Sequence, residues 1–161
     1  ENNLFKKNEY HKKVIKNWMY ANSIHLIDYF RMFGRGQIKN VKTTHTKISK
    51  NKKIVNAEIN FSSGDLGIYK CFWNLNSPWA VSIIYEDQRF ELKPLEIMNY
   101  YVRNSKIKTF KPKKNDLKFK PGFKLQIDKF LKKIQGSKNK LLPDIRDSEF
   151  TMKLINQIYK K

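Results

Sequence analysis

The stretch NSIHLIDYFRMFG, residues 22–34, carries the polar side chains whose types and spacing could do chemistry. His25, Asp28 and Arg31 follow one another at intervals of three residues, with apolar residues between them. A histidine can exchange a proton near neutral pH, and the dipole at a helix N-terminus favours its neutral form. Asp28 and Arg31 lie one helical turn apart and can form an ion pair worth roughly 0.3 kcal/mol. Two interpretations fit this spacing, a catalytic helix and the polar edge of an ordinary amphipathic helix.

The same stretch is predicted to form an amphipathic helix over residues 22–33. Asn22 or Ser23 can cap its start, and Gly34 and Gly36 can end it. The segment VIKNWMY just before it, residues 14–20, is expected to be extended. One apolar stripe at spacings of three and four supports the helix, and it comprises Ile24, Ile27, Tyr29, Phe30 and Phe33.

The middle of the chain changes to the period of β-strands. Residues 37–48 are rich in β-branched side chains, and residues 54–75 alternate apolar and polar side chains on either side of the turn SSGD. The latter segment predicts a hairpin. Further strands are expected in WAVSIIYED (79–87) and QRFELKP (88–94), and KIKTFKP (106–112) fits either a short strand or an extended connection. LEIMNYYVR (95–103) fits either a strand or a short helix.

Helical patterns return at the end, in residues 121–136 and 146–161. Strands grouped together, with helices before and after them, indicate the α+β class. We therefore expect one domain over residues 1–161, with an open, mostly antiparallel sheet of about five or six strands and helices packed on one face. The apolar stripes of the two closing helices comprise Phe123, Ile127, Phe130, Leu131 and Ile134 in the first, and Phe150, Leu154, Ile155 and Ile158 in the second.

The charge of the chain is strongly positive, +20, with 34 Lys and Arg residues against 14 Asp and Glu residues. Such a balance suits a nucleic acid or another anionic partner. Base-edge and bidentate phosphate recognition favour arginine, however, and here lysine dominates. A solvated lysine surface is therefore the other interpretation, and nucleic-acid binding through the sheet stays an alternative. The few arginines are Arg31, Arg35, Arg89, Arg103 and Arg146.

Several kinds of site have no pattern in this sequence. The glycines of GRG (34–36) follow a predicted helix, whereas a dinucleotide fingerprint follows a strand and opens a helix. His11, His25 and His45 are too isolated to predict a metal site, and the single Cys71 permits no internal disulfide. A reducing cytoplasm fits that usage. No apolar run approaches the ~20 residues of a membrane span, so no membrane partner is expected.

Three segments resemble the C-terminal domain of the Gfo/Idh/MocA family of NAD(P)-dependent oxidoreductases. NSIHLIDYFRMFGRGQIKNV resembles the family's histidine-bearing helix and first strand, and AEINFSSGDLGIYKCFWN is similar to its hairpin. KPGFKLQIDKFLKKIQG and LPDIRDSEFTMKLINQIYKK resemble the paired terminal helices. ELKPLE (91–96) is similar to a stretch in relatives encoded with surface-polysaccharide pathways. The resemblance covers about residues 14–161.

This resemblance implies a sugar- or nucleotide-sugar-directed oxidoreductase in which an N-terminal Rossmann domain, absent from this chain, binds NAD or NADP. The C-terminal domain would then supply part of the substrate pocket, and the chain alone would be inactive. His25 matches the family histidine that assists proton transfer at the reacting hydroxyl. The family's aspartate four residues earlier is replaced by Ala21, and Asn22 beside it is the candidate for hydrogen bonding to the sugar. Asp28 is expected to be structural.

An open sheet face also predicts a partner subunit, because exposed apolar residues on a sheet are costly unless something covers them. About half of the aromatic residues on alternating strand positions should pack beneath the helices. The other half would face the substrate or a second copy, so we expect a homodimer or higher oligomer through the open sheet face. The candidates are Tyr69, Phe72, Trp73, Trp79 and Tyr85.

Overall fold

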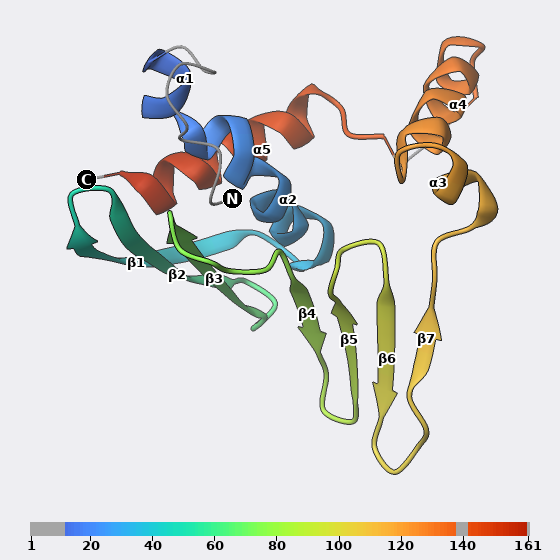
Figure 1. Ribbon diagram of the computed structural model, residues 1–161, viewed down its shortest axis with the longest axis horizontal. Coiled ribbons are helices and arrows are strands. Elements are labelled where there is room, and N and C mark those ends of the chain that lie inside the picture. Colours follow the sequence, from blue (N-terminus) through green and yellow to red (C-terminus); the bar gives the residue numbers. More distant parts are fainter. Residues whose placement is uncertain (1–11, 138–141, 161) are drawn as a thin grey trace. The chain divides into compact units, whose positions relative to one another are not determined.

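The computed structural model describes residues 12–137 and 142–160 (Figure 1). Along the chain, the antiparallel strands are grouped between flanking helices, which confirms the predicted α+β class. The described residues form two compact units. Unit 1 contains those up to Ser77 and those from Asp147 onward, and unit 2 is Pro78–Arg146.

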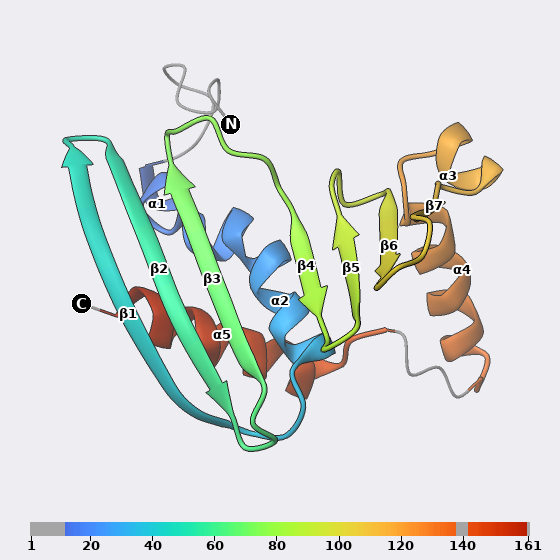
Figure 2. The same cartoon turned by 90° about the horizontal axis from the view of Figure 1, so that it is seen from below.

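Unit 1 is a three-stranded sheet covered on one face by helices. Its strands β1 (Ile38–Ser49), β2 (Lys52–Phe61) and β3 (Leu66–Trp73) lie in the order β1-β2-β3, and both pairs are antiparallel. Helices α2 (Ile24–Phe33) and α5 (Ile145–Tyr159) lie over the same face of this sheet (Figure 2). Before α2 come the short helix α1 (Lys12–Lys16) and a π-helical turn, η1 (Met19–Ser23).

The core of the protein lies between this sheet and these two helices. Alternate residues of β2 are buried, as a half-covered strand requires, and α5 buries one stripe at helical spacing. Glycines let α2 approach the sheet closely: a Cβ at Gly34 would lie 2.2 Å from the Phe61 ring, and one at Gly67 would lie 2.7 Å from the Phe30 ring. The buried apolar residues are Ile27, Val55, Ala57, Ile59, Phe61, Tyr69, Leu154, Ile155 and Ile158.

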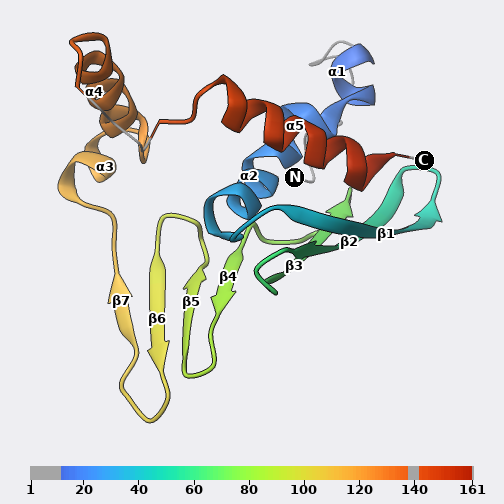
Figure 3. The same cartoon turned by 180° about the vertical axis from the view of Figure 1, so that it is seen from behind.

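Unit 2 is a four-stranded antiparallel meander followed by two helices. Strands β4 (Val81–Ile84), β5 (Gln88–Leu92), β6 (Met98–Val102) and β7 (Lys108–Phe110) pair in chain order. Helices α3 (Lys114–Lys118) and α4 (Phe123–Ile134) follow beyond the end of β7, and α4 does not lie over a face of the four-stranded sheet (Figures 1 and 3). Among the described residues of Pro78–Arg146, none is buried.

The strands thus form two sheets where one was expected. The interruption falls between β3 and β4, where Asn74 takes a left-handed φ of 54° and Pro78 offers no amide hydrogen for a ladder. LEIMNYYVR contains strand β6. The hairpin predicted for residues 54–75 is confirmed as β2 and β3, with partners running from Lys53–Trp73 to Asn60–Leu66.

Two local predictions are wrong. Residues 14–20 are largely helical, in α1 and η1, and Ser23 makes no capping bond because the helix already runs through it. His25 therefore lies inside a continuous helical segment and not at a helix N-terminus, as had been predicted. The first closing helix, α4, forms as its stripe predicts. It does not pack on a face of the four-stranded sheet, although helices were expected to cover the sheet.

Candidate functional site

His25 is exposed to solvent and is the second residue of α2, two positions after the end of the π-helical turn. Asn22 is half-buried within that turn and Ala21 is exposed. π-Helical turns are rare and occur frequently at functional sites, because the extra residue shifts the phase of the side chains that follow. The structure thus brings the two predicted site residues, Asn22 and His25, onto one turn of helix.

The turn is held in place by a hydrogen-bonded cluster beneath it. Ser23, the last residue of η1, is buried, and its hydroxyl lies 3.3 Å from that of Tyr159 on α5. The Tyr159 hydroxyl lies 2.9 Å from the hydroxyl of Tyr69 on β3. Burial raises the pKa of Tyr159 to about 12 and raises that of Tyr69 further. Both phenols therefore stay protonated at neutral pH, and the cluster anchors the segment that carries Asn22 and His25.

Asp28 holds α2 against α5. Arg31 donates two hydrogen bonds to its carboxylate, at 2.8 and 2.9 Å, and the buried Thr151 of α5 donates a third at 2.6 Å. Arg31 also reaches Asp147 at 3.1 Å. Burial raises the pKa of Asp28, but the hydrogen bonds from Arg31 and Thr151 outweigh it, so the pKa is lowered overall. The predicted pair of Asp28 with Arg31 is confirmed, and its geometry fits a structural role.

Helical spacing puts Tyr29, Met32 and Phe33 on the same side of α2 as His25. Tyr29, one turn after His25, stacks on Phe33 with ring centroids 5.8 Å apart. Met32 and Phe33 are 57% and 43% exposed. An imidazole beside exposed aromatic surface can exchange a proton with a bound hydroxyl while the apolar groups contact the carbon face of the ligand.

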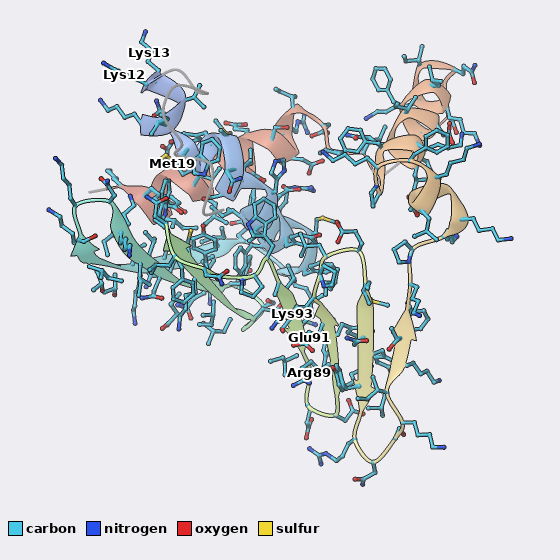
Figure 4. The ribbon with its side chains drawn as sticks, viewed as in Figure 1. Lys12, Lys13, Met19, Arg89, Glu91 and Lys93 are labelled. Carbon is cyan, nitrogen blue, oxygen red and sulfur yellow. The ribbon has the colours of Figure 1, made fainter. Side chains whose placement is uncertain are left out.

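Unit 2 contains a groove. A groove of about 630 Å³ is lined by Pro78 and Trp79 and by residues 93–96, which belong to the segment ELKPLE. Arg89 and Glu91 alternate along β5, and Lys93, just after the strand, lines the groove (Figure 4). The Tyr101 ring lies under the Arg89 guanidinium at 4.2 Å and its hydroxyl donates to Glu91 at 3.0 Å. Sequence reasoning missed this polar face, because alternation shows which residues share a face but not which face is polar.

The predicted open-face aromatics divide as the alternation requires. Tyr69 and Trp73 face the core, whereas Phe72 pairs with Ile54 on the opposite face of the same sheet. In unit 2, Tyr85 is 53% exposed and lies edge-on to Phe90 with ring centroids 6.3 Å apart. Trp79 is half-buried at the groove.

The described residues also bear on metal and cofactor binding. Within residues 12–137 and 142–160, no group of three His, Cys, Asp or Glu side chains is placed to hold a metal ion, and His11 lies outside this range. The described residues contain no Rossmann-type strand–glycine turn–helix element, because both sheets are antiparallel and GRG joins α2 to β1 rather than a strand to a helix. No described helix has both the length and the apolar character needed to cross a bilayer.

Comparison with known proteins adds no assignment. Neither the protein-family models nor the curated proteins compared with this chain match it.

Proposed function

We propose that this chain is the substrate-binding and subunit-interface domain of a sugar- or nucleotide-sugar-directed oxidoreductase similar to the Gfo/Idh/MocA family. An N-terminal Rossmann domain outside this chain would bind NAD or NADP and supply the hydride chemistry, in the reducing cytoplasm that the single cysteine suits. The order of the elements supports the proposal: a histidine-bearing helix, a run of antiparallel strands that form two sheets, and a closing helix that packs beside the first.

The observation that carries the proposal is the exposed position of His25 on a rigidly held helix. The Asp28 and Ser23 contacts fix α2 and η1 to α5, so the imidazole projects from a rigid support. Precise placement of a proton-transferring group is what catalysis needs. His25 would exchange a proton with a sugar hydroxyl, and the Asn22 amide would hydrogen-bond a neighbouring one. Ala21 supplies no carboxylate, so His25 would act without that partner.

The proposed site is tested by nuclear magnetic resonance of the histidine rings during titration with nucleotide sugars. We expect the His25 signals to shift and saturate, while those of His45, whose Nε2 donates to the Ile158 carbonyl at 2.9 Å, stay unchanged. Asn22→Ala should weaken binding several-fold. Asn17→Ala, at an exposed amide just before η1, is the matched control. Shifts absent from His25, or equal at both rings, contradict the proposal.

The assignment of the cofactor to another domain is tested separately. Calorimetric titration of this chain with NAD or NADP should show no micromolar binding, because the described sheets lack the strand–turn–helix cradle. Tight binding would place the cofactor site within the chain and refute the division of roles. The two experiments are independent, because sugar binding at His25 requires no dinucleotide.

The subunit interface is proposed on the apolar face of the unit 2 sheet. Residues on alternate positions of β4, β5 and β6 share this face, and Phe90 stacks on Tyr100 with centroids 4.7 Å apart. No described residue of the unit is buried, so the face needs a cover. A second copy can supply the same apolar surface. Gln88 and Lys108 also lie on this face, and its apolar residues are Val81, Ile83, Phe90, Leu92, Met98, Tyr100, Val102 and Phe110.

Neighbouring positions of β4 give a matched test of this interface. Ile83→Lys puts a charge on the apolar face and should shift sedimentation to the monomer. Ser82→Lys puts the same charge on the opposite face and should leave the oligomer intact. A wild-type chain that stays monomeric at high concentration, or a dimer that tolerates Ile83→Lys, would refute the interface.

A further inference from the structure

Helix α4 has an apolar face that no described residue of its unit covers. Its stripe spans about 100° of the helix circumference, because five apolar residues recur at spacings of three and four. Each of these side chains is between 50% and 68% exposed. The residues are Phe123, Ile127, Phe130, Leu131 and Ile134.

Lysines lie at both borders of this apolar face, and one of them, Lys124, is paired with Asp128 at 3.4 Å. Residues 113–134 contain eight lysines, two aspartates and no arginine. At 100° per residue, Lys124 and Lys133 lie at the two borders of the stripe, and Lys129 and Lys132 lie on the opposite side. The aliphatic stem of a border lysine can follow the apolar surface while its ammonium group stays in water. At the start of α4 the Lys120 ammonium itself lies over the Phe123 ring, 4.8 Å from its centre.

The geometry before α4 extends the same surface. The Gly122 amide donates to the Asp116 carboxylate at 3.0 Å, which ties the start of α4 to α3. Leu117 and Phe119 next to this joint are 74% and 48% exposed. Lysines alternate with these apolar residues at positions 118 and 120. The combination of apolar and basic groups therefore runs through α3 and α4 together.

We propose that the apolar, lysine-bordered face of α3 and α4 docks on an anionic lipid surface. Burial of the stripe in the headgroup region removes apolar surface from water, and the bordering lysines meet anionic headgroups. A second copy of α4 would bring like charges together. A nucleic acid would use the lysines but leave the aromatic stripe uncovered. Lysine without arginine suits attraction to diffuse negative charge more than bidentate recognition.

This proposal goes beyond the proposed oxidoreductase role and does not depend on it. It revises the expectation of no membrane partner, which rested on the absence of a spanning segment. Surface docking needs no span, because the helix lies in the plane of the interface. It also places the anionic partner on a helix, whereas the sequence had suggested the sheet.

Vesicle flotation tests the proposal with a control on the same helix. The chain should float with vesicles of phosphatidylcholine mixed with phosphatidylserine, much less with phosphatidylcholine alone, and less in raised salt. Phe130→Ser should reduce partitioning about tenfold. Leu125→Ser removes a side chain that is 56% exposed on the lysine-bearing side, and it should change partitioning less than about twofold. Lys133→Gln should reduce partitioning about fivefold.

A spectroscopic measurement separates docking from a general loss of structure. In a Cys71→Ser background, a polarity-sensitive dye on Phe130→Cys should shift to the blue with anionic vesicles, and on Leu125→Cys it should not. Equal responses at both positions overturn the proposal. So do salt-insensitive flotation with both vesicle types, Phe130-dependent self-association without lipid, and binding to generic DNA without flotation.

Discussion

Replacing Tyr159 by Phe should remove part of an alkaline sensitivity built into the core. The Tyr159 hydroxyl lies within hydrogen-bonding distance of those of Tyr69 and Ser23, and burial raises its pKa to about 12 from 10.0. A tyrosine with a raised pKa contributes stability below its unfolded value, and this contribution is lost as the pH rises toward the folded value. Stability should therefore fall above about pH 10.

The size of the loss follows from linkage. From about pH 9 to about pH 11, ionisation of such a buried tyrosine lowers the free energy of unfolding by about 1 kcal/mol. The pKa of Tyr69 is also raised, chiefly by burial, so Tyr69 adds to this loss. The wild-type chain should therefore lose about 1 kcal/mol more over this range than Tyr159→Phe. At neutral pH the variant should be less stable by about 1 kcal/mol, because it lacks the phenol's hydrogen bonds.

Guanidinium unfolding followed by far-ultraviolet circular dichroism at the two pH values measures both quantities. Tyr85→Phe is the control, because that ring is 53% exposed and should leave the pH dependence unchanged. Equal losses in the wild type and in Tyr159→Phe would refute the argument that the buried phenol is held neutral.

Three further substitutions test the contacts of α2. Gly67→Ala should lower the free energy of unfolding by about 2 kcal/mol in guanidinium unfolding, because its Cβ would stand 2.7 Å from the Phe30 ring. Asp28→Asn should cost about 2 kcal/mol at neutral pH. Because the pKa of Asp28 is lowered below 3.8, the wild type should also lose stability as pH falls through that region, more steeply than the variant. Thr151→Val, which removes one donor to Asp28, should cost about 1 kcal/mol and leave its ion pair with Arg31 in place.

The elements of the fold were largely predictable from periodicity. Alternation in residues 54–75 identified β2 and β3, and helical stripes identified α2, α4 and α5. Those patterns arise from contacts within one element or between neighbours in sequence. They can therefore be read from the sequence without knowledge of the fold. The division into two sheets was not predictable, because alternation does not show which strands pair across an interruption such as Asn74 to Pro78.

The neighbourhood of His25 was predictable only in part. Ser23 looked like a helix cap, yet its hydroxyl lies near that of Tyr159, far along the chain. Local propensity favours serine at a cap, and the tertiary partner overrides it. The contact that extends the helix upstream of His25 therefore has no local signature. The pair of Asp28 and Arg31 was predictable because both residues lie on one turn of helix. The hydrogen bond from Thr151 to Asp28 was not predictable, because Thr151 is far from Asp28 in the sequence.

The two units differ in how their apolar residues are covered. The charges beside each exposed apolar face indicate which kind of partner could cover it. All buried apolar residues among those described belong to unit 1, where α2 and α5 cover the sheet. In unit 2 the sheet and α4 each present apolar surface, which marks both for a partner because such patches are costly in water. The sheet face bears mainly uncharged side chains and suits an identical surface. The α4 face is bordered by lysines on both sides, so an identical surface would repel it and an anionic one would attract it. A large exposed apolar area indicates that a partner covers the face, and the charges at the border of the face indicate which partner fits.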